Sequence, residues 1–199
     1  MPTKLLQQKI KNGLSYLQYR KLVKDLLQGG KSTGLEQTEE RFNFSKLNDK
    51  RMDRLDKTLN LTDEAKNFTA SLSKKFTFLV IAEGWCGDAA QVLPIINLIA
   101  EASDNFDLKI VLRDENEDLM RQFLTNGSKA IPKIIIVDDA YNLINSWGPR
   151  PYIATKMVQD YKAKNGVVDA IIKKDLQLWY NKDKGISTQS DLVNLLKAS

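Results

Sequence analysis

Two residue types that carry much of enzyme chemistry are scarce in this sequence. Its 199 residues include no histidine and a single cysteine, Cys86. Histidine is the usual general base near neutral pH and the commonest metal ligand, so its absence excludes Ser-His and Cys-His catalysis and histidine-ligated metals within this chain. One cysteine cannot form an internal disulfide. We therefore expect no metal site, and any sulfur chemistry must depend on Cys86 alone.

Long apolar runs are missing as well. No stretch of the sequence approaches the roughly 20 apolar residues that span a bilayer. The first residues, MPTKLLQQKIKNG, lack the apolar core and small-residue cleavage site of a signal peptide. These absences predict a cytoplasmic protein without a membrane partner, in a compartment where thiols stay reduced.

Acidic residues are in the minority. The chain has 30 Lys and Arg against 25 Asp and Glu, a net charge of +5, and the basic excess lies within residues 1–73. A basic segment can attract nucleic acid. Here, however, basic and acidic residues are interspersed and aromatic residues are sparse. We therefore interpret the segment as a solvated helical surface and do not expect nucleic acid as a partner.

The spacing of apolar residues predicts an α/β protein. Amphipathic helices are expected over 4–28, 45–60, 62–73, 86–102, 117–124, 152–164, 168–180 and 190–197, and short strands over 76–82, 108–112, 134–137 and 143–147. From residue 74 the order is β-α-β-α-β-β-α, which is typical of layered α/β folds. We therefore divide the chain into a helical extension, 1–73, packed on the core, and an α/β domain, 74–199, with a helical C-terminal extension.

The cysteine lies in the stretch EGWCGDA, between a predicted strand and a predicted helix. A helix start lowers the pKa of a thiol, because backbone N–H groups and the helix dipole favour the thiolate. The Asp88 carboxylate acts against this effect, so the sequence leaves the sign of the net pKa shift open. Cys86 is a candidate nucleophile, and the alternative is a small buried residue at a strand-helix junction.

This stretch and three later segments resemble the thioredoxin superfamily. EGWCGDA is similar to the family's tryptophan-cysteine-glycine-proline-cysteine motif, and Pro94 lies where the family has a proline in the following helix. KAIPKIIIVD resembles the segment with the family's cis-proline, here Pro132, and LINSWG resembles the last strand, which ends at Gly148. The resemblance implies a thioredoxin-like three-layer α/β/α fold with a mixed central sheet, plus an N-terminal helical extension and extra C-terminal helices. The WCGDA form looks most like uncharacterised bacterial thioredoxin-like proteins.

Two positions depart from the family pattern. Ala89 stands where thioredoxins have their resolving cysteine, and Val80 stands where they have a buried acid. The resemblance therefore implies monothiol chemistry, in which an external thiol must release any mixed disulfide formed at Cys86. It also implies a substrate groove beside the sulfur, with walls from Trp85, Gly87, Ile131, Pro132 and Gly148.

Acidic and aromatic side chains near the motif allow two interpretations. Asp88 could shuttle a proton to Cys86, but an acid in a first helical turn is already explained by the helix dipole. We interpret Glu83 as a solvated loop acid. Near the C-terminus, Trp179 and Tyr180 are expected to anchor a helix by packing.

A basic segment, KLNDKRMDRLDK, could supply an anion pocket next to the cysteine. Arg51 and Arg54 would bind a carboxylate or a phosphate there. The alternative is an amphipathic helix with charge pairs, such as Asp53 with Lys50 or Lys57.

Two function hypotheses follow. The first is monothiol thiol-disulfide exchange in cell redox homeostasis, with a protein or a low-molecular-weight thiol or disulfide as substrate. It needs no cofactor, but it could use glutathione or another small thiol as co-substrate. If the chain is an enzyme, it is then a monothiol oxidoreductase. The second is a non-redox module that binds a protein or peptide on a thioredoxin scaffold. The sequence indicates neither the substrate nor the oligomeric state.

Overall fold

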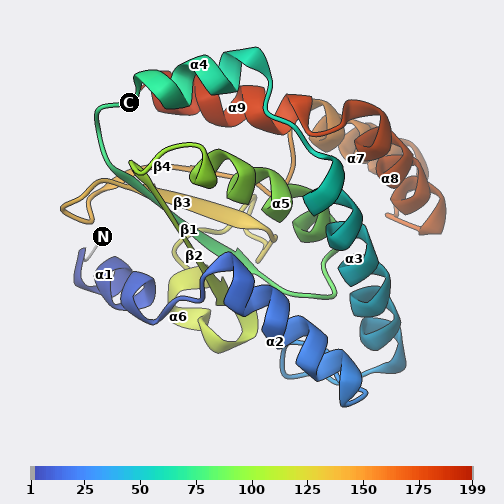
Figure 1. Cartoon of the computed structure of the whole chain (residues 1–199). Coiled ribbons are helices and arrows are strands. Elements are labelled where there is room, and N and C mark those ends of the chain that lie inside the picture. The colour runs from blue at the N-terminus through green and yellow to red at the C-terminus, as the bar shows by residue number, and fades with distance from the viewer. Residues whose placement is uncertain (1–2, 199) are drawn as a thin grey trace.

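A mixed four-stranded sheet lies at the centre of the computed structural model, which describes residues 3–198 (Figure 1). The strands are β1 (Phe76–Ala82), β2 (Phe106–Leu112), β3 (Lys133–Val137) and β4 (Leu143–Trp147). Their spatial order is β2-β1-β3-β4, with β1 parallel to β2 and the other two pairings antiparallel. Every residue of β3 is buried, as expected for an apolar strand covered on both faces. The predicted α/β architecture is confirmed.

Helices cover the sheet and one another. Their bounds are α1 (Thr3–Asn12), α2 (Tyr16–Gln28), α3 (Glu39–Thr58), α4 (Asp63–Ser71), α5 (Gly87–Glu101), α6 (Glu117–Met120), α7 (Tyr152–Asn165), α8 (Ala170–Asp183) and α9 (Ile186–Lys197). Helix α5 packs on β2 and contacts both α3 and α9, while α4 lies along α9 (Figure 1). Because α5 is enclosed, every residue from position 88 to position 96 is buried. This enclosure fixes the first turn of α5, where the cysteine lies.

The single helix predicted over residues 4–28 is wrong. The chain forms α1 and α2, separated at Gly13, Leu14 and Ser15. Leu14 exchanges two backbone hydrogen bonds of 2.8 Å with Ile110 of β2, so the break adds a bridge to the sheet edge. A Cβ atom at Gly13 would lie 2.9 Å from the Cβ of Lys109, which explains the glycine. Ser15 then begins α2 with a capping box.

Helix α3 begins six residues earlier than predicted, because Thr38 caps it by accepting the N–H of Arg41. Its acidic face turns toward α2. The buried Arg20 of α2 donates to carboxylates of Asp49 and Asp53, at 2.8 and 2.7 Å, and to Asp56 at 3.1 Å. Asp53 therefore pairs with Arg20 and with Lys24, not with Lys50 or Lys57 as the sequence suggested. These pairs hold α3 in place against α2.

The remaining differences concern the ends of elements. The helix predicted over 117–124 ends at Met120, and α9 begins four residues before the predicted start. Thr62 caps α4 as expected, accepting the N–H of Ala65. The domain division at residues 73 and 74 stays a prediction. Within residues 3–198, no helix has the length and apolar character needed to cross a membrane.

Candidate functional site

Cys86 lies where the chain leaves β1 and enters α5. It is the N-cap of α5, and its Sγ accepts the N–H of Ala89 at 3.5 Å. The thiol donates to the carbonyl oxygen of Ile131 at 3.3 Å. The following peptide bond, Ile131–Pro132, is cis. The sulfur is therefore held between the start of α5 and the loop that leads into β3, and the cysteine is only 8% exposed.

Burial decides the protonation of this thiol. Burial is the largest effect and the Asp88 carboxylate adds to it, while the N–H groups of Ala89 and Asp88 and the Arg150 guanidinium act in the opposite direction. Together they raise the pKa of Cys86 to about 12. The sequence left the sign of the net pKa shift open, and the structure shows that it favours the neutral thiol. In this structure Cys86 is a protonated hydrogen-bond donor at neutral pH, not a thiolate.

Asp88 belongs to a buried polar cluster beside the cysteine. Its Oδ2 lies 2.6 Å from Nη2 of Arg150, and its Oδ1 accepts the hydroxyl of Tyr180 at 3.0 Å. Burial raises the pKa of Asp88, and the two donors lower it. With both oxygens engaged, the carboxylate is fixed by its partners. Within the described residues, the Asp88 carboxylate makes no hydrogen bond to the sulfur, so its role as a proton shuttle stays a prediction.

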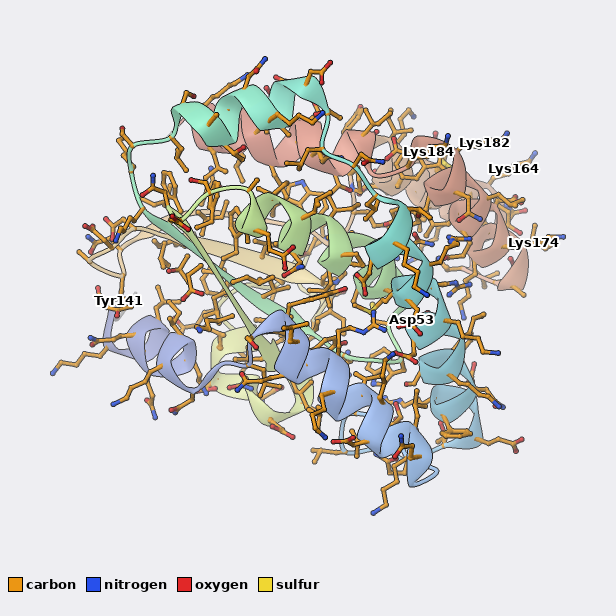
Figure 2. The ribbon with its side chains drawn as sticks, in the orientation of Figure 1. Asp53, Tyr141, Lys164, Lys174, Lys182 and Lys184 are labelled. Carbon is orange, nitrogen blue, oxygen red and sulfur yellow. The ribbon has the colours of Figure 1, made fainter. Side chains whose placement is uncertain are left out.

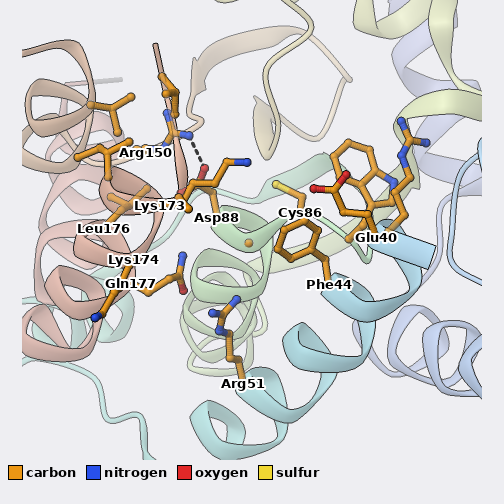
Figure 3. Close-up of a pocket in the computed structure, with 17 residues that line it drawn as sticks. Glu40, Phe44, Arg51, Cys86, Asp88, Arg150, Lys173, Lys174, Leu176 and Gln177 are labelled. Atoms are coloured by element: carbon orange, nitrogen blue, oxygen red, sulfur yellow. Dashed lines mark ion pairs between the residues drawn. The ribbon is translucent and has the colours of Figure 1, made fainter. Parts of the chain in front are cut away.

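A cavity of about 730 Å³ opens over Cys86. Figure 3 shows the start of α5 with Cys86 and Asp88 between two walls, α3 on one side and α8 on the other. From α3 come Glu40, Arg41, Phe44 and Arg51; from α7 and α8 and the turn between them come Val158, Val168, Ala170, Ile172, Lys173, Lys174, Leu176 and Gln177. Helices that precede the four strands in the sequence and helices that follow them thus line the approach to the sulfur.

The predicted groove residues separate into two groups. Trp85 and Gly87 line the cavity with the cysteine. Ile131, Pro132 and Gly148 lie behind the sulfur and are not among the lining residues. Gly148 has a φ of 118°, and a Cβ atom there would lie 2.3 Å from the carbonyl oxygen of Pro132. The backbone just after β4 thus packs closely against the loop that contains Pro132. Access to the sulfur comes from the α3–α8 side.

The residues before the cysteine differ from the prediction. Glu83, expected to be a solvated loop acid, is fully buried and accepts the N–H of Asp114 at 3.0 Å. Burial raises its pKa. The Trp85 ring contacts two guanidinium groups in cation–π geometry, with its centroid 4.6 Å from Cζ of Arg41 and 4.8 Å from Cζ of Arg113. These contacts fix the loop that carries the cysteine.

Only one of the two arginines predicted to bind an anion lies at the cavity. Arg51 lines it and donates to Oδ1 of Asn48 at 2.8 Å. Arg54 instead is exposed and donates to Asn181 of α8. In place of Arg54, the structure brings Arg150 and Lys173 to the site.

Sequence reasoning missed two partners of Asp88. Arg150 follows the recognised Gly148 by two positions, so proximity to that position could have indicated it. Tyr180 was expected only to pack a helix, yet its hydroxyl reaches Asp88 across 92 residues of sequence. No pattern in the sequence predicts this contact, because α8 lies outside the recognised motifs. Among residues 3–198, no three acidic or cysteine side chains are grouped as metal ligands would be.

Comparison with known proteins identifies the fold and the family. A search of curated protein sequences returned no match. Among solved structures, a protein of unknown function, PA1234 from Pseudomonas aeruginosa, is 17% identical with a TM-score of 0.61, over 93% of this chain and 98% of that one. An HIV epitope scaffold is 18% identical with a TM-score of 0.60, over 94% of this chain and 99% of that one. Residues 34–162, which include α3, the sheet and Cys86, match the family model described as thioredoxin. The chain therefore belongs to the thioredoxin family.

Proposed function

We propose that this chain is a thioredoxin-fold binding protein that takes a small molecule into the cavity over Cys86. The observation that carries the proposal is the enclosure of the sulfur. A thioredoxin-type site that acts on proteins must admit the disulfide of a folded substrate, whereas Cys86 is 8% exposed beneath the walls of α3 and α8. A cavity of about 730 Å³ falls in the range of small-molecule sites and is too small for a folded partner.

The state of the thiol supports this proposal. Cys86 donates its proton to Ile131 O and is buried, so the fraction of nucleophilic thiolate at neutral pH is very small. The sulfur then forms part of the cavity floor. A ligand that fills the cavity blocks the route to it.

The experiment follows binding of a neutral fluorescent apolar probe, N-phenyl-1-naphthylamine, together with alkylation of Cys86 by iodoacetamide. We expect one binding site, retained in Cys86→Ser, and slower alkylation when the probe is bound. Loss of binding in Cys86→Ser, or an alkylation rate independent of the probe, would contradict the proposal.

Monothiol exchange is the second candidate, and a specific observation favours it. The sulfur faces both the helix start and the Ile131–Pro132 loop, the positions that the family resemblance assigns to a nucleophile and its docking loop. In this reaction the Cys86 thiolate attacks a small disulfide, forming a mixed disulfide and releasing one thiolate, after its own proton passes to a buffer base. An external thiolate then attacks the mixed disulfide, forms a new small disulfide and releases the Cys86 thiolate.

The two candidates differ in one measurement. The protein is incubated with 2-hydroxyethyl disulfide at pH 7.5 and its intact mass is recorded, with Cys86→Ser as the control. An unchanged mass is expected for a binding protein with a protonated thiol. A mixed disulfide on the wild type within minutes would establish exchange as the better assignment.

A further inference from the structure

Some of the charged groups that line the cavity are already paired. Arg150 pairs with Asp88 at 2.6 Å, and Arg41 pairs with Glu36 at 2.6 Å. Arg51 is different, because its described partner is the neutral amide oxygen of Asn48. Lys173 contacts the ring of Phe44 at 5.9 Å. Within the described residues, no ion pair involves Arg51, Lys173 or Lys174, so the cavity lining includes three cations without a carboxylate partner.

Arg51 and Lys173 come from opposite walls of the cavity. In Figure 3, the Arg51 side chain rises from α3 and that of Lys173 reaches in from α8, both toward the space beside the first turn of α5. Lys174, although next in sequence, points outward into solvent together with Lys164, Lys182 and Lys184 (Figure 2). Arg51 is half-buried, and an incompletely hydrated guanidinium gains more from an anion than an exposed one does.

The rest of the cavity indicates what else the ligand must carry. Val158, Ile172 and Leu176 form an apolar wall opposite α3. Glu40, which also lines the cavity and has no ion pair within the described residues, lies eleven residues before Arg51 along α3. That spacing separates the two by roughly 16 Å of helix rise, so acidic and basic ends of the cavity are distinct. A negative group is favoured at the Arg51 end and disfavoured near Glu40.

We propose that the ligand of this cavity is an amphipathic organic anion, with its apolar body against α7 and α8 and its carboxylate or phosphate at Arg51, while Lys173 adds positive charge from the opposite wall. The first turn of α5 adds the positive end of its helix dipole to the same space. This inference rests on the proposed binding function and assigns its ligand class.

The test compares two probes that share an apolar body. 8-Anilinonaphthalene-1-sulfonate carries a negative group, and N-phenyl-1-naphthylamine lacks it. We expect the wild type to bind the anionic probe at one site about tenfold more tightly than the neutral probe, as one charge-assisted contact allows. The substitution Arg51→Met should remove most of this preference, and Lys173→Gln should reduce it.

Matched variants control for charge alone. Arg54→Met removes a neighbouring guanidinium on the same helix that is outside the cavity lining, and Lys182→Gln removes an outward-pointing lysine of α8. Both should keep the preference for the anionic probe. Displacement of that probe by octanoate or by octyl phosphate, compared with octanol, then assigns the carboxylate or the phosphate as the preferred group.

The possible failures are distinguishable. If neither probe binds, the cavity does not take small molecules and the proposed function itself fails. If both probes bind equally, or if Arg51→Met and Arg54→Met have the same effect, the cavity binds but the anion assignment is overturned. Equal displacement by octanol, octanoate and octyl phosphate would overturn it as well.

Discussion

Asp88 and Arg150 form a largely buried ion pair, with 2.6 Å between Oδ2 and Nη2. Asp88 lies two positions along the chain from Cys86. The two charges act on the thiol in opposite directions. The carboxylate raises the pKa of Cys86 and the guanidinium lowers it, while burial has the largest effect and raises it. The pair therefore leaves the cysteine protonated, although the cysteine begins a helix.

Replacing the acid should make the cysteine more reactive. In Asp88→Asn the negative charge is removed and Arg150 loses its counter-charge, so both effects lower the pKa of Cys86. A fall of about one to three units is expected for removal of one nearby charge. While the pKa stays above the pH, each unit by which it falls raises the thiolate fraction about tenfold. The rate of alkylation by iodoacetamide at pH 8 should therefore rise at least about tenfold.

Asp104→Asn is the matched control, because Asp104 is exposed beyond the other end of α5. It removes the same charge and should leave the alkylation rate unchanged. An equal rate in wild type and Asp88→Asn would show that Asp88 has no influence on the thiol.

Substitutions of Asp88 and Arg150 should also have coupled effects on the free energy of unfolding. Arg150→Met leaves the Asp88 carboxylate buried with Tyr180 as its remaining donor, which should lower the free energy of unfolding by about 3 kcal/mol. Asp88→Asn/Arg150→Met removes both charges and should recover part of this loss. Urea unfolding of the four proteins, with unchanged m-values, measures the coupling.

An exposed ion pair provides the comparison. Lys156 and Asp160 of α7 lie 2.8 Å apart with both side chains more than half exposed. Lys156→Met should leave the stability within error of the wild type, because water and salt screen such pairs. Strict additivity of the Asp88 and Arg150 substitutions would show that the buried pair is not coupled.

The fold could be predicted from local patterns because each pattern has a local cause. Apolar runs gave the four strands, and the Thr62 cap gave the start of α4. The errors occurred where tertiary contacts override local preference. The helix over 4–28 breaks because Leu14 pairs with Ile110, a contact between residues 96 positions apart in the sequence.

The site was only partly predictable, for a related reason. Cys86, Trp85 and Gly87 are neighbours in sequence, so a motif could indicate them together. The cavity, in contrast, is assembled from α3 and α8, whose surfaces meet only in the folded chain. No local signal shows that Arg51 would line the cavity while Arg54 would face Asn181, because both follow the same helical charge pattern.

The burial of Glu83 should make its contribution to stability decrease as the pH rises, which is the opposite of the usual effect of a carboxylate. Burial raises the pKa of Glu83 in the folded protein above its unfolded value of about 4.3. The folded state therefore binds a proton more tightly than the unfolded state does. The contribution of Glu83 to stability should be greatest below about pH 4.3 and should decrease as pH rises through the folded pKa.

Glu83→Gln removes this titration and keeps a side-chain oxygen for the N–H of Asp114. The stability of the variant relative to the wild type should therefore increase from pH 4 to pH 8, measured as the difference in Tm at each pH. Glu117 gives the opposite control, since hydrogen bonds from Lys129 and Arg121 lower its pKa. The relative stability of Glu117→Gln should decrease over the same range. If Tm changed with pH in the same way for Glu83→Gln and the wild type, folding would leave the pKa of Glu83 at its ordinary value.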